Sequence, residues 1–175
     1  PYTDAGFRQI LEASLRPLYE ARGRIRVTFP SVTTQKAEKV DGLVVTIAIQ
    51  EGAVFKLGTV RWEGVVSTLQ AEVDKAADFK KGDVANFDDV NAGLARVHDR
   101  YLSAGFLKQT AKVDRDVQEQ EALVNLTVGV EPGPQYSMGR LTITGLDILS
   151  EPSIRKMWRL ETGKRLSPLL LGQFL

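Results

Sequence analysis

The sequence contains no cysteine, a single histidine and no long apolar run, and each of these absences excludes a class of protein. Without cysteine, the chain can form neither a disulfide nor a thiolate zinc site. No stretch approaches the roughly 18 consecutive apolar residues that a membrane-spanning helix needs. An excess of one charge is lacking too, because 23 Lys and Arg residues balance 22 Asp and Glu residues. This balance argues against a general nucleic-acid binder, which needs a strong positive field.

Candidates for catalysis are equally scarce. His98 falls off the apolar face of an expected helix, so we expect a solvated side chain rather than a catalytic base. The neighbouring carboxylates Asp88 and Asp89 fall in the first turn of that helix, where the helix dipole favours negative charge. No residue spacing suits a metal, and the glycines match no phosphate-binding loop. We therefore expect no enzymatic activity, no cofactor and no metal.

One basic cluster is present towards the C-terminal end. A solvated helix face is the favoured interpretation, and a lipid-facing patch or a nucleic-acid patch are the alternatives. The aromatic residues Phe55, Trp62 and Tyr101 are not interleaved with basic residues, so we expect them to pack rather than to stack on bases. The cluster consists of Arg155, Lys156, Arg159, Lys164 and Arg165.

An internal repeat is the most informative feature that the sequence does have. Residues 52–64 and 133–145 share glycine, aromatic and apolar positions at an offset of 81. We therefore expect residues 53–132 to form one complete unit, residues 1–52 the second half of a preceding unit, and residues 133–175 the first half of a following unit. At an offset of 82, Asp4, Leu15, Tyr19 and Gly23 match Asn86, Val97, Tyr101 and Gly105.

The two half-units lead to a further expectation, that the chain is a fragment of something longer. Each half should expose an apolar face, which further chain would cover or which two molecules would cover by exchanging halves. The face in the first half-unit consists of Leu43, Val45, Ile47 and Ile49.

The complete unit has the pattern strand, helix, helix, strand, strand. Alternation around Val60 and Trp62 indicates the first strand. A capping box at residues 67–70 is expected to open the first helix, and residues 81–83 to end it. Asn86 should cap the second helix, which should end at Gly105. The apolar stripe of this second helix is Val90, Leu94, Val97 and Tyr101.

Two strands, residues 107–115 and 124–130, then alternate on either side of a polar turn at residues 117–121. A right-handed crossover places both helices on one face of the sheet. The predicted fold class is therefore α+β, with tandem β-α-α-β-β repeats and a three-stranded mixed sheet. In the first half-unit, we expect Asp4 to cap a helix that Pro17 kinks or breaks, followed by a strand at residues 24–32.

This ordered set of residues resembles the polypeptide-transport-associated (POTRA) domain. The pattern is glycine, aromatic, glycine, two alternating apolar residues and glycine, followed by Gly-Asp and by Tyr-x-x-x-Gly-Phe. Arg24 departs from it, because the family usually has an aromatic residue where Phe106 stands in the complete unit. The matching residues are Gly52, Phe55, Gly58, Val60, Trp62, Gly64, Gly82, Asp83, Tyr101, Gly105 and Phe106.

The resemblance implies a non-catalytic interaction module in the periplasmic part of an outer-membrane protein. Its partners would be unfolded outer-membrane client polypeptides, accessory lipoproteins and a C-terminal β-barrel of the same chain, with no nucleic acid. The alternative is a βαα-type nucleic-acid-binding module, which the near-zero charge and the acidic middle unit disfavour.

The candidate binding site is the second strand of the complete unit, which we expect at the sheet edge. An edge strand can accept another strand through backbone hydrogen bonds, without demanding one sequence. The opposing interpretation is that Lys108 and Lys112 keep the edge from pairing. The equivalent strand in the first half-unit carries Pro30 and is a poorer template. The candidate residues are Leu107, Lys108, Gln109, Thr110, Ala111, Lys112, Val113, Asp114 and Arg115.

Overall fold

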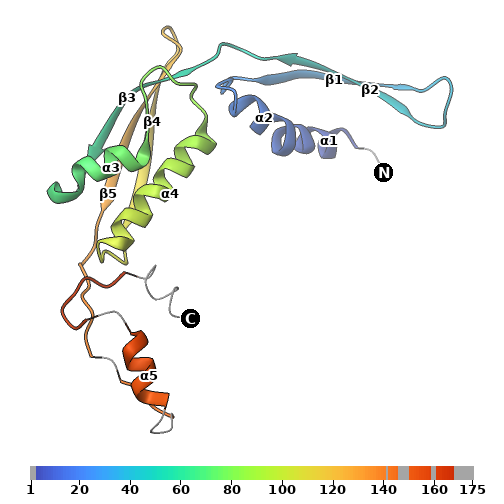
Figure 1. The fold of residues 1–175 in the computed structure, drawn as a ribbon. Helices are drawn as coiled ribbons and strands as arrows, with labels where there is room; N and C mark the ends of the chain where they lie inside the picture. The colour runs from blue at the N-terminus through green and yellow to red at the C-terminus, as the bar shows by residue number, and fades with distance from the viewer. Residues whose placement is uncertain (1–2, 141, 146–149, 159–160, 168–175) are drawn as a thin grey trace. The chain divides into compact units, whose positions relative to one another are not determined.

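The computed structural model describes residues 3–140, 142–145, 150–158 and 161–167 (Figure 1). The chain divides into two compact units. The first unit comprises Pro1–Val60, Phe79–Asn91 and Arg115–Leu126, and the second comprises Arg61–Asp78, Ala92–Asp114 and Thr127–Leu175.

The first unit begins with a helical segment in three parts: α1 (Asp4–Ile10), the π-helical turn η1 (Leu11–Leu15) and α2 (Arg16–Glu20). Thr3 caps α1 by accepting a hydrogen bond from the Gly6 amide at 3.1 Å, so the expected cap at Asp4 is wrong by one residue. Pro17 lies in the first turn of α2, where its missing N–H is tolerated. The expected break at Pro17 is therefore a π-helical turn between two short α-helices.

Two antiparallel strands, β1 (Thr28–Lys36) and β2 (Leu43–Gln50), follow these helices. The expected strand at residues 24–32 thus starts and ends four residues too early. The register shifts between Thr28 and Ser31, at the position of Pro30, so this proline does interrupt the ladder. Figure 1 shows the helices along one side of the two strands. A core cluster of Leu11, Val27 and Phe29 joins them, with Phe7, Leu15, Tyr19, Val32 and Ile47 packed against it.

The expected apolar face of β2 is partly exposed. Leu43 and Ile49 are 52% and 38% exposed, whereas Ile47 packs on the core cluster and Val45 is half-buried. Within the described residues, β2 pairs with β1 alone.

A three-stranded sheet in the order β3-β5-β4 follows, built from β3 (Lys56–Glu63), β4 (Thr110–Gln118) and β5 (Leu123–Glu131). The last strand is central, as expected. The Lys56 amide donates to the Ala122 carbonyl at the start of both β3 and β5, so these two strands run parallel. β4 and β5 are consecutive in the chain and neighbours in the sheet, so they form a hairpin. The predicted mixed three-stranded α+β fold is confirmed. The buried residues of β5 alternate along the strand: Val124, Leu126, Val128 and Val130.

The second unit contains the 3₁₀ turn η2 (Ser67–Leu69) and α3 (Gln70–Ala77). No side chain caps either of them, so the expected capping box at residues 67–70 is wrong. Just before η2, the Tyr101 hydroxyl accepts a hydrogen bond from the Val66 amide at 3.3 Å.

The end of α3 also differs from the expectation. Asp78 adopts the left-handed conformation (φ 53°) and ends the helix before residues 81–83 are reached. Arg96 of α4 (Phe87–Ser103) donates to the carbonyl oxygens of Ala76 and Ala77 at 2.7 and 2.9 Å. A side chain distant in sequence therefore satisfies the last carbonyls of α3.

The second helix, α4, follows the prediction closely. The Asn86 side chain accepts a hydrogen bond from the Asp88 amide at 3.0 Å, which confirms the expected cap. Val90, Val97 and Tyr101 are buried, and Leu94 is half-buried. In the second unit, α3 and the C-terminal part of α4 lie on the same face of the strands (Figure 1).

One more described helix, α5 (Ser150–Met157), follows β5 along the chain. Of the basic cluster, Arg155 and Lys156 are on α5, while Lys164 and Arg165 follow it. Arg159 lies outside the described residues.

Candidate functional site

The candidate strand does lie at a sheet edge, because β5 is the only neighbour of β4 among the described strands. Its bounds differ from the expected residues 107–115. The strand begins at Thr110 and continues to Gln118, so Leu107, Lys108 and Gln109 precede it and three further residues extend it. The sequence signal for this extension was Val117, which lies four residues after Val113 and therefore on the same face of the strand.

The displaced start of β4 has a long-range cause. Gln109 is only 5% exposed, and its Oε1 lies 2.6 Å from Nδ1 of His98 on α4. The interaction holds residue 109 against the helix rather than in the ladder. His98 is half-buried and hydrogen-bonded, so the expectation of a freely solvated histidine is wrong. It remains a structural residue, since it contacts no other ionisable group in the described hydrogen bonds.

A matched pair of substitutions tests this interaction. Gln109 Nε2 has no hydrogen-bond partner in the described structure, so the amide is only half satisfied. His98→Ala should leave both polar atoms of the amide unsatisfied and lower the free energy of unfolding by about 1–3 kcal/mol. Gln109→Leu should cost less, because it removes the buried amide and leaves unpaired only a nitrogen of the half-buried His98. Urea denaturation of both variants measures the difference, and equal losses would contradict it.

The side chains of β4 present two different faces. Val113 and Val117 are half-buried, and Arg115 between them places its guanidinium carbon 3.7 Å from the centre of the Phe87 ring on α4. This cation–π contact covers part of an otherwise exposed arginine. The residues on the opposite face, among them Lys112 and Asp114, are exposed, and these two form an ion pair at 3.3 Å.

The direction of the backbone groups along β4 follows from Gly129 on β5. A Cβ atom added to Gly129 would lie 4.0 Å from the Lys112 carbonyl oxygen, so this carbonyl points towards β5. In an antiparallel ladder, the backbone groups of successive residues point to opposite sides. The amides of Ala111 and Val113 therefore point to the open edge.

The other edge strand, β3, is partly covered. The Leu57 amide donates to the Asp83 carbonyl, and the Gly82 amide donates to the Leu57 carbonyl, both at 2.8 Å. The start of β3 is thus already paired on its outer side. β4 is the better candidate for strand addition.

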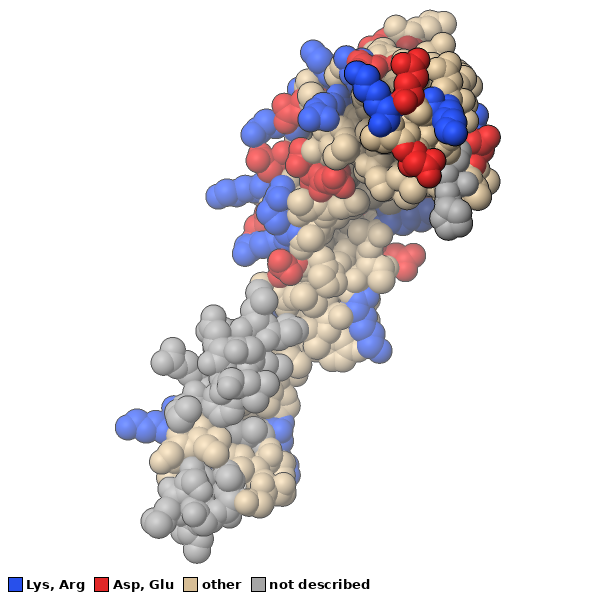
Figure 2. All heavy atoms as spheres, turned by 90° about the vertical axis from the view of Figure 1, so that its right-hand side faces the viewer, with Lys and Arg blue, Asp and Glu red and all other residues tan. Residues whose placement is uncertain are grey.

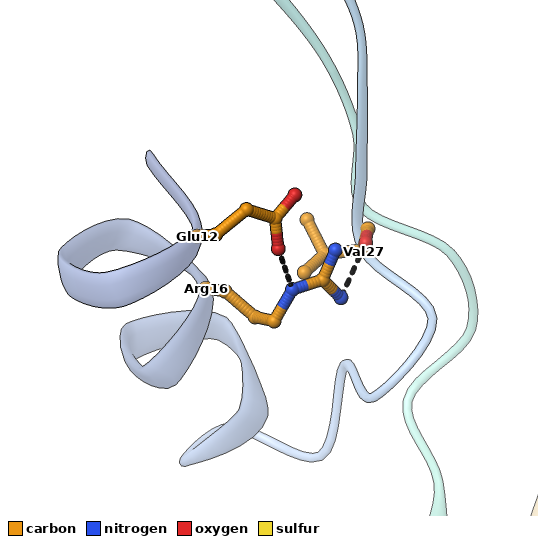
Figure 3. Close-up of polar contacts among 3 residues, drawn as sticks. All are labelled: Glu12, Arg16 and Val27. Atoms are coloured by element: carbon orange, nitrogen blue, oxygen red, sulfur yellow. Dashed lines mark hydrogen bonds and ion pairs between the residues drawn. The ribbon is translucent and has the colours of Figure 1, made fainter. Parts of the chain in front are cut away.

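The first unit repeats the contact between helix and edge strand with different chemistry. Arg16 stands 82 residues before His98, and Figure 3 shows its side chain between Glu12 and the Val27 backbone. It pairs with Glu12 and donates to the Val27 carbonyl at 3.0 Å. The pairing lowers the pKa of the Glu12 carboxyl and raises the pKa of the Arg16 guanidinium. In the first unit α2 is thus hydrogen-bonded to the segment before β1, and in the second unit α4 is hydrogen-bonded to the segment before β4.

Other kinds of site find little support in the described part of the chain. No group of three or more His, Asp or Glu residues there could hold a metal ion. None of the helices that the structure describes is both long enough and apolar enough to cross a bilayer. Figure 2 shows basic and acidic side chains interspersed on the face in view, rather than one large basic area.

The chain resembles known proteins in both sequence and structure. The sequence model of the POTRA family, described as surface antigen variable number repeat, matches residues 55–133. An outer membrane protein assembly factor of Treponema pallidum (strain Nichols) is 26% identical over 162 residues, which is 87% of this chain and 19% of that protein. Outer membrane protein assembly factor BamA of Neisseria meningitidis serogroup B (strain MC58) is 23% identical over 159 residues, covering 90% of this chain and 20% of that protein.

Among solved structures, the crystal structure of Haemophilus influenzae BamA POTRA3-5 resembles this chain with a TM-score of 0.63. The two are 18% identical, and the match covers 99% of this chain and 68% of that one, which shows a common fold. The chain spans about a fifth of the length of the curated relatives that it matches. The chain therefore contains one segment, residues 55–133, that matches the POTRA family.

Proposed function

We propose that this chain is a non-catalytic, periplasmic interaction module of an outer-membrane protein assembly or translocation factor, and that β4 receives extended client polypeptides by strand addition. The observation that carries the proposal is the place of β4 at the sheet edge, with the amides of Ala111 and Val113 directed outwards. Backbone hydrogen bonds along such an edge give affinity for many sequences. A receiver of diverse unfolded proteins needs this tolerance.

The relatives support the proposed location and partners of the chain. Two proteins that match most of the chain are named outer membrane protein assembly factors. On this basis we propose the periplasm as the location, a C-terminal outer-membrane β-barrel as part of the longer protein, and accessory lipoproteins as further partners. Residues 1–52 and 133–175 are proposed to be parts of neighbouring POTRA-like domains, and in the isolated chain two molecules can exchange them.

The lysines of the edge argue less strongly against pairing than the sequence suggested. Lys112 forms an ion pair with Asp114 on the same strand, so its charge is locally balanced. Lys108 precedes the strand and does not flank the open amides of β4. An incoming strand would therefore not meet an uncompensated row of like charges.

The faces of β4 indicate which client strands fit best. The side that carries Val113 and Val117 continues towards Phe87, whereas the opposite side carries the exposed pair Lys112 and Asp114. An added strand would continue both faces. We therefore propose a preference for segments in which apolar and polar residues alternate, the pattern of strands that face lipid on one side of a barrel.

Ala111→Pro tests the proposal at an exposed position. Proline removes the outward amide and blocks the approach of a second strand, whereas Ala111→Ser keeps the amide and serves as the matched control. The peptide loses one or two backbone hydrogen bonds and can no longer lie close to β4, so its affinity should fall about tenfold. Fluorescence anisotropy with a labelled alternating peptide measures this, and a thermal melt confirms that the variant is folded.

Two results would contradict strand addition at β4. One is an unchanged affinity of folded Ala111→Pro. The other is a wild-type chain that binds no extended peptide while Lys112→Thr does, which would identify the lysine as a guard against pairing.

A further inference from the structure

The glycine that ends the second helix recurs in both units with the same contacts. Gly23 follows α2 and Gly105 follows α4, with φ of 76° and 90°. The carbonyl of each accepts a hydrogen bond from the amide of an aromatic residue further along the chain. The Phe55 amide donates to Gly23 and the Tyr136 amide donates to Gly105, both at 2.8 Å.

Both contacts are closer than any other residue type would allow. A Cβ atom on Gly23 would lie 2.6 Å from the Phe55 carbonyl oxygen, and one on Gly105 would lie 2.6 Å from the Tyr136 carbonyl oxygen. Real Cβ atoms do not approach a backbone oxygen so closely, so any side chain here must push the aromatic residue away. The glycine therefore does more than reverse the chain after a helix.

The aromatic residue is also hydrogen-bonded to a loop of its own repeat. Its carbonyl accepts a hydrogen bond at 3.0 Å from an amide about 30 residues later, Ala85 for Phe55 and Leu166 for Tyr136. One aromatic residue thus connects the preceding helix end with a loop of its own repeat. This double connection is the same at both places, which lie 81–82 residues apart.

A second contact accompanies the first at each place. A Cβ atom on Gly52 would lie 3.4 Å from the Arg26 Cβ, and one on Gly133 would lie 3.4 Å from the Lys108 Cβ. At each place, the segment just before the edge strand therefore lies close to the glycine that precedes the aromatic residue.

We propose that these contacts form a docking joint that holds each repeat to the next one. The joint consists of the helix-end glycine, the aromatic residue and its two backbone hydrogen bonds: Gly23 with Phe55, and Gly105 with Tyr136. It fixes the connection between repeats locally, and it does not depend on whether β4 binds clients. The simpler alternative is that the glycine is needed only for its left-handed conformation at the helix end.

Gly82 separates these two explanations. Its φ is 95°, close to that of Gly105, but a Cβ atom there would have no described neighbour within 4 Å. Gly105→Ala and Gly82→Ala therefore carry similar backbone strain, and only Gly105→Ala displaces the aromatic residue. Amide hydrogen exchange by NMR on the full chain compares them.

In Gly105→Ala, we expect the Tyr136 amide to exchange at least about tenfold faster, while the Val128 amide in the sheet stays protected. Gly82→Ala should leave the Tyr136 amide unchanged. Gly23→Ala repeats the test at the other joint, with the Phe55 amide as the reporter. The proposal is overturned if Gly105→Ala leaves Tyr136 protected, if Gly82→Ala exposes it equally, or if the Val128 amide loses protection to the same degree.

A second experiment covers the case in which Gly105→Ala does not fold. Tyr136→Pro removes the amide donor without adding an atom to the helix end, and Tyr136→Phe keeps the amide as the control. Because the chain has no cysteine, spin labels can be placed at Lys75→Cys and Lys156→Cys on exposed helix positions. Tyr136→Pro should broaden the electron–electron distance distribution and Tyr136→Phe should not, whereas equal widths would overturn the joint.

Discussion

Replacing Tyr101 with alanine is expected to lower the free energy of unfolding by about 3–5 kcal/mol, a large part of the stability of a small domain. The side chain is completely buried. Its ring packs edge-on against Phe106, with the ring centres 5.7 Å apart. Its hydroxyl accepts a hydrogen bond from the Val66 amide, just before η2. The substitution therefore opens a cavity and also leaves a backbone donor unsatisfied.

Tyr101→Phe separates the two contributions. It keeps the ring and removes only the hydroxyl, so it should cost about 1–3 kcal/mol, the cost of an unsatisfied backbone amide. Urea denaturation of both variants measures the costs. A loss for Tyr101→Ala no larger than that for Tyr101→Phe would show that the ring does not fill the core.

Alkaline pH provides an independent check on the burial of Tyr101. Burial raises the pKa of its phenol, and the hydrogen bond from the Val66 backbone offsets this in part. The folded state therefore holds the phenol proton more tightly than the unfolded state does. This contribution to stability is full below the ordinary tyrosine pKa of about 10 and is lost as the pH rises through the higher folded value.

Replacing Gly64 with alanine is expected to be about as damaging as losing the Tyr101 ring. Gly64 follows β3 with φ of 72°, and a Cβ atom there would lie 2.2 Å from the Val130 carbonyl oxygen on the central strand. Left-handed strain of about 1–2 kcal/mol adds to about 1–3 kcal/mol for overpacking against a backbone that cannot move aside.

Gly82→Ala is the matched control for this prediction as well, because it has a similar φ and no close neighbour. It should cost only the strain of about 1–2 kcal/mol. Thermal melts of both variants decide the matter, and equal melting temperatures would contradict the close approach of Gly64 to β5.

The sequence predicted those features that local patterns and the repeat determine. The sequence of helices and strands along the chain, the Asn86 cap and the apolar stripe along α4 all follow from residues near one another in the chain. The position of the edge strand followed from the order of elements within the unit, in which the last strand lies in the middle of the sheet.

Errors arose where a residue distant in sequence supplied the decisive interaction. Ser67 makes no capping hydrogen bond, and the nearby Val66 amide is bonded instead by Tyr101, 35 residues further along the chain. His98 holds Gln109 outside the ladder, so β4 begins three residues later than its alternation suggests. The cation–π contact between Phe87 and Arg115 was missed for the same reason, since alternation places Arg115 on a face without naming its partner.

The central claim, that β4 receives an extended strand, is tested most directly by NMR on the chain with a bound alternating peptide. Strand addition predicts intermolecular nuclear Overhauser effects between the peptide backbone and the backbone of residues 110–118. It also predicts slowed exchange of the Ala111 and Val113 amides, which point to the open edge. Contacts of the peptide with β3, the β1–β2 pair or the helices, with no protection of the Ala111 and Val113 amides, would contradict the claim.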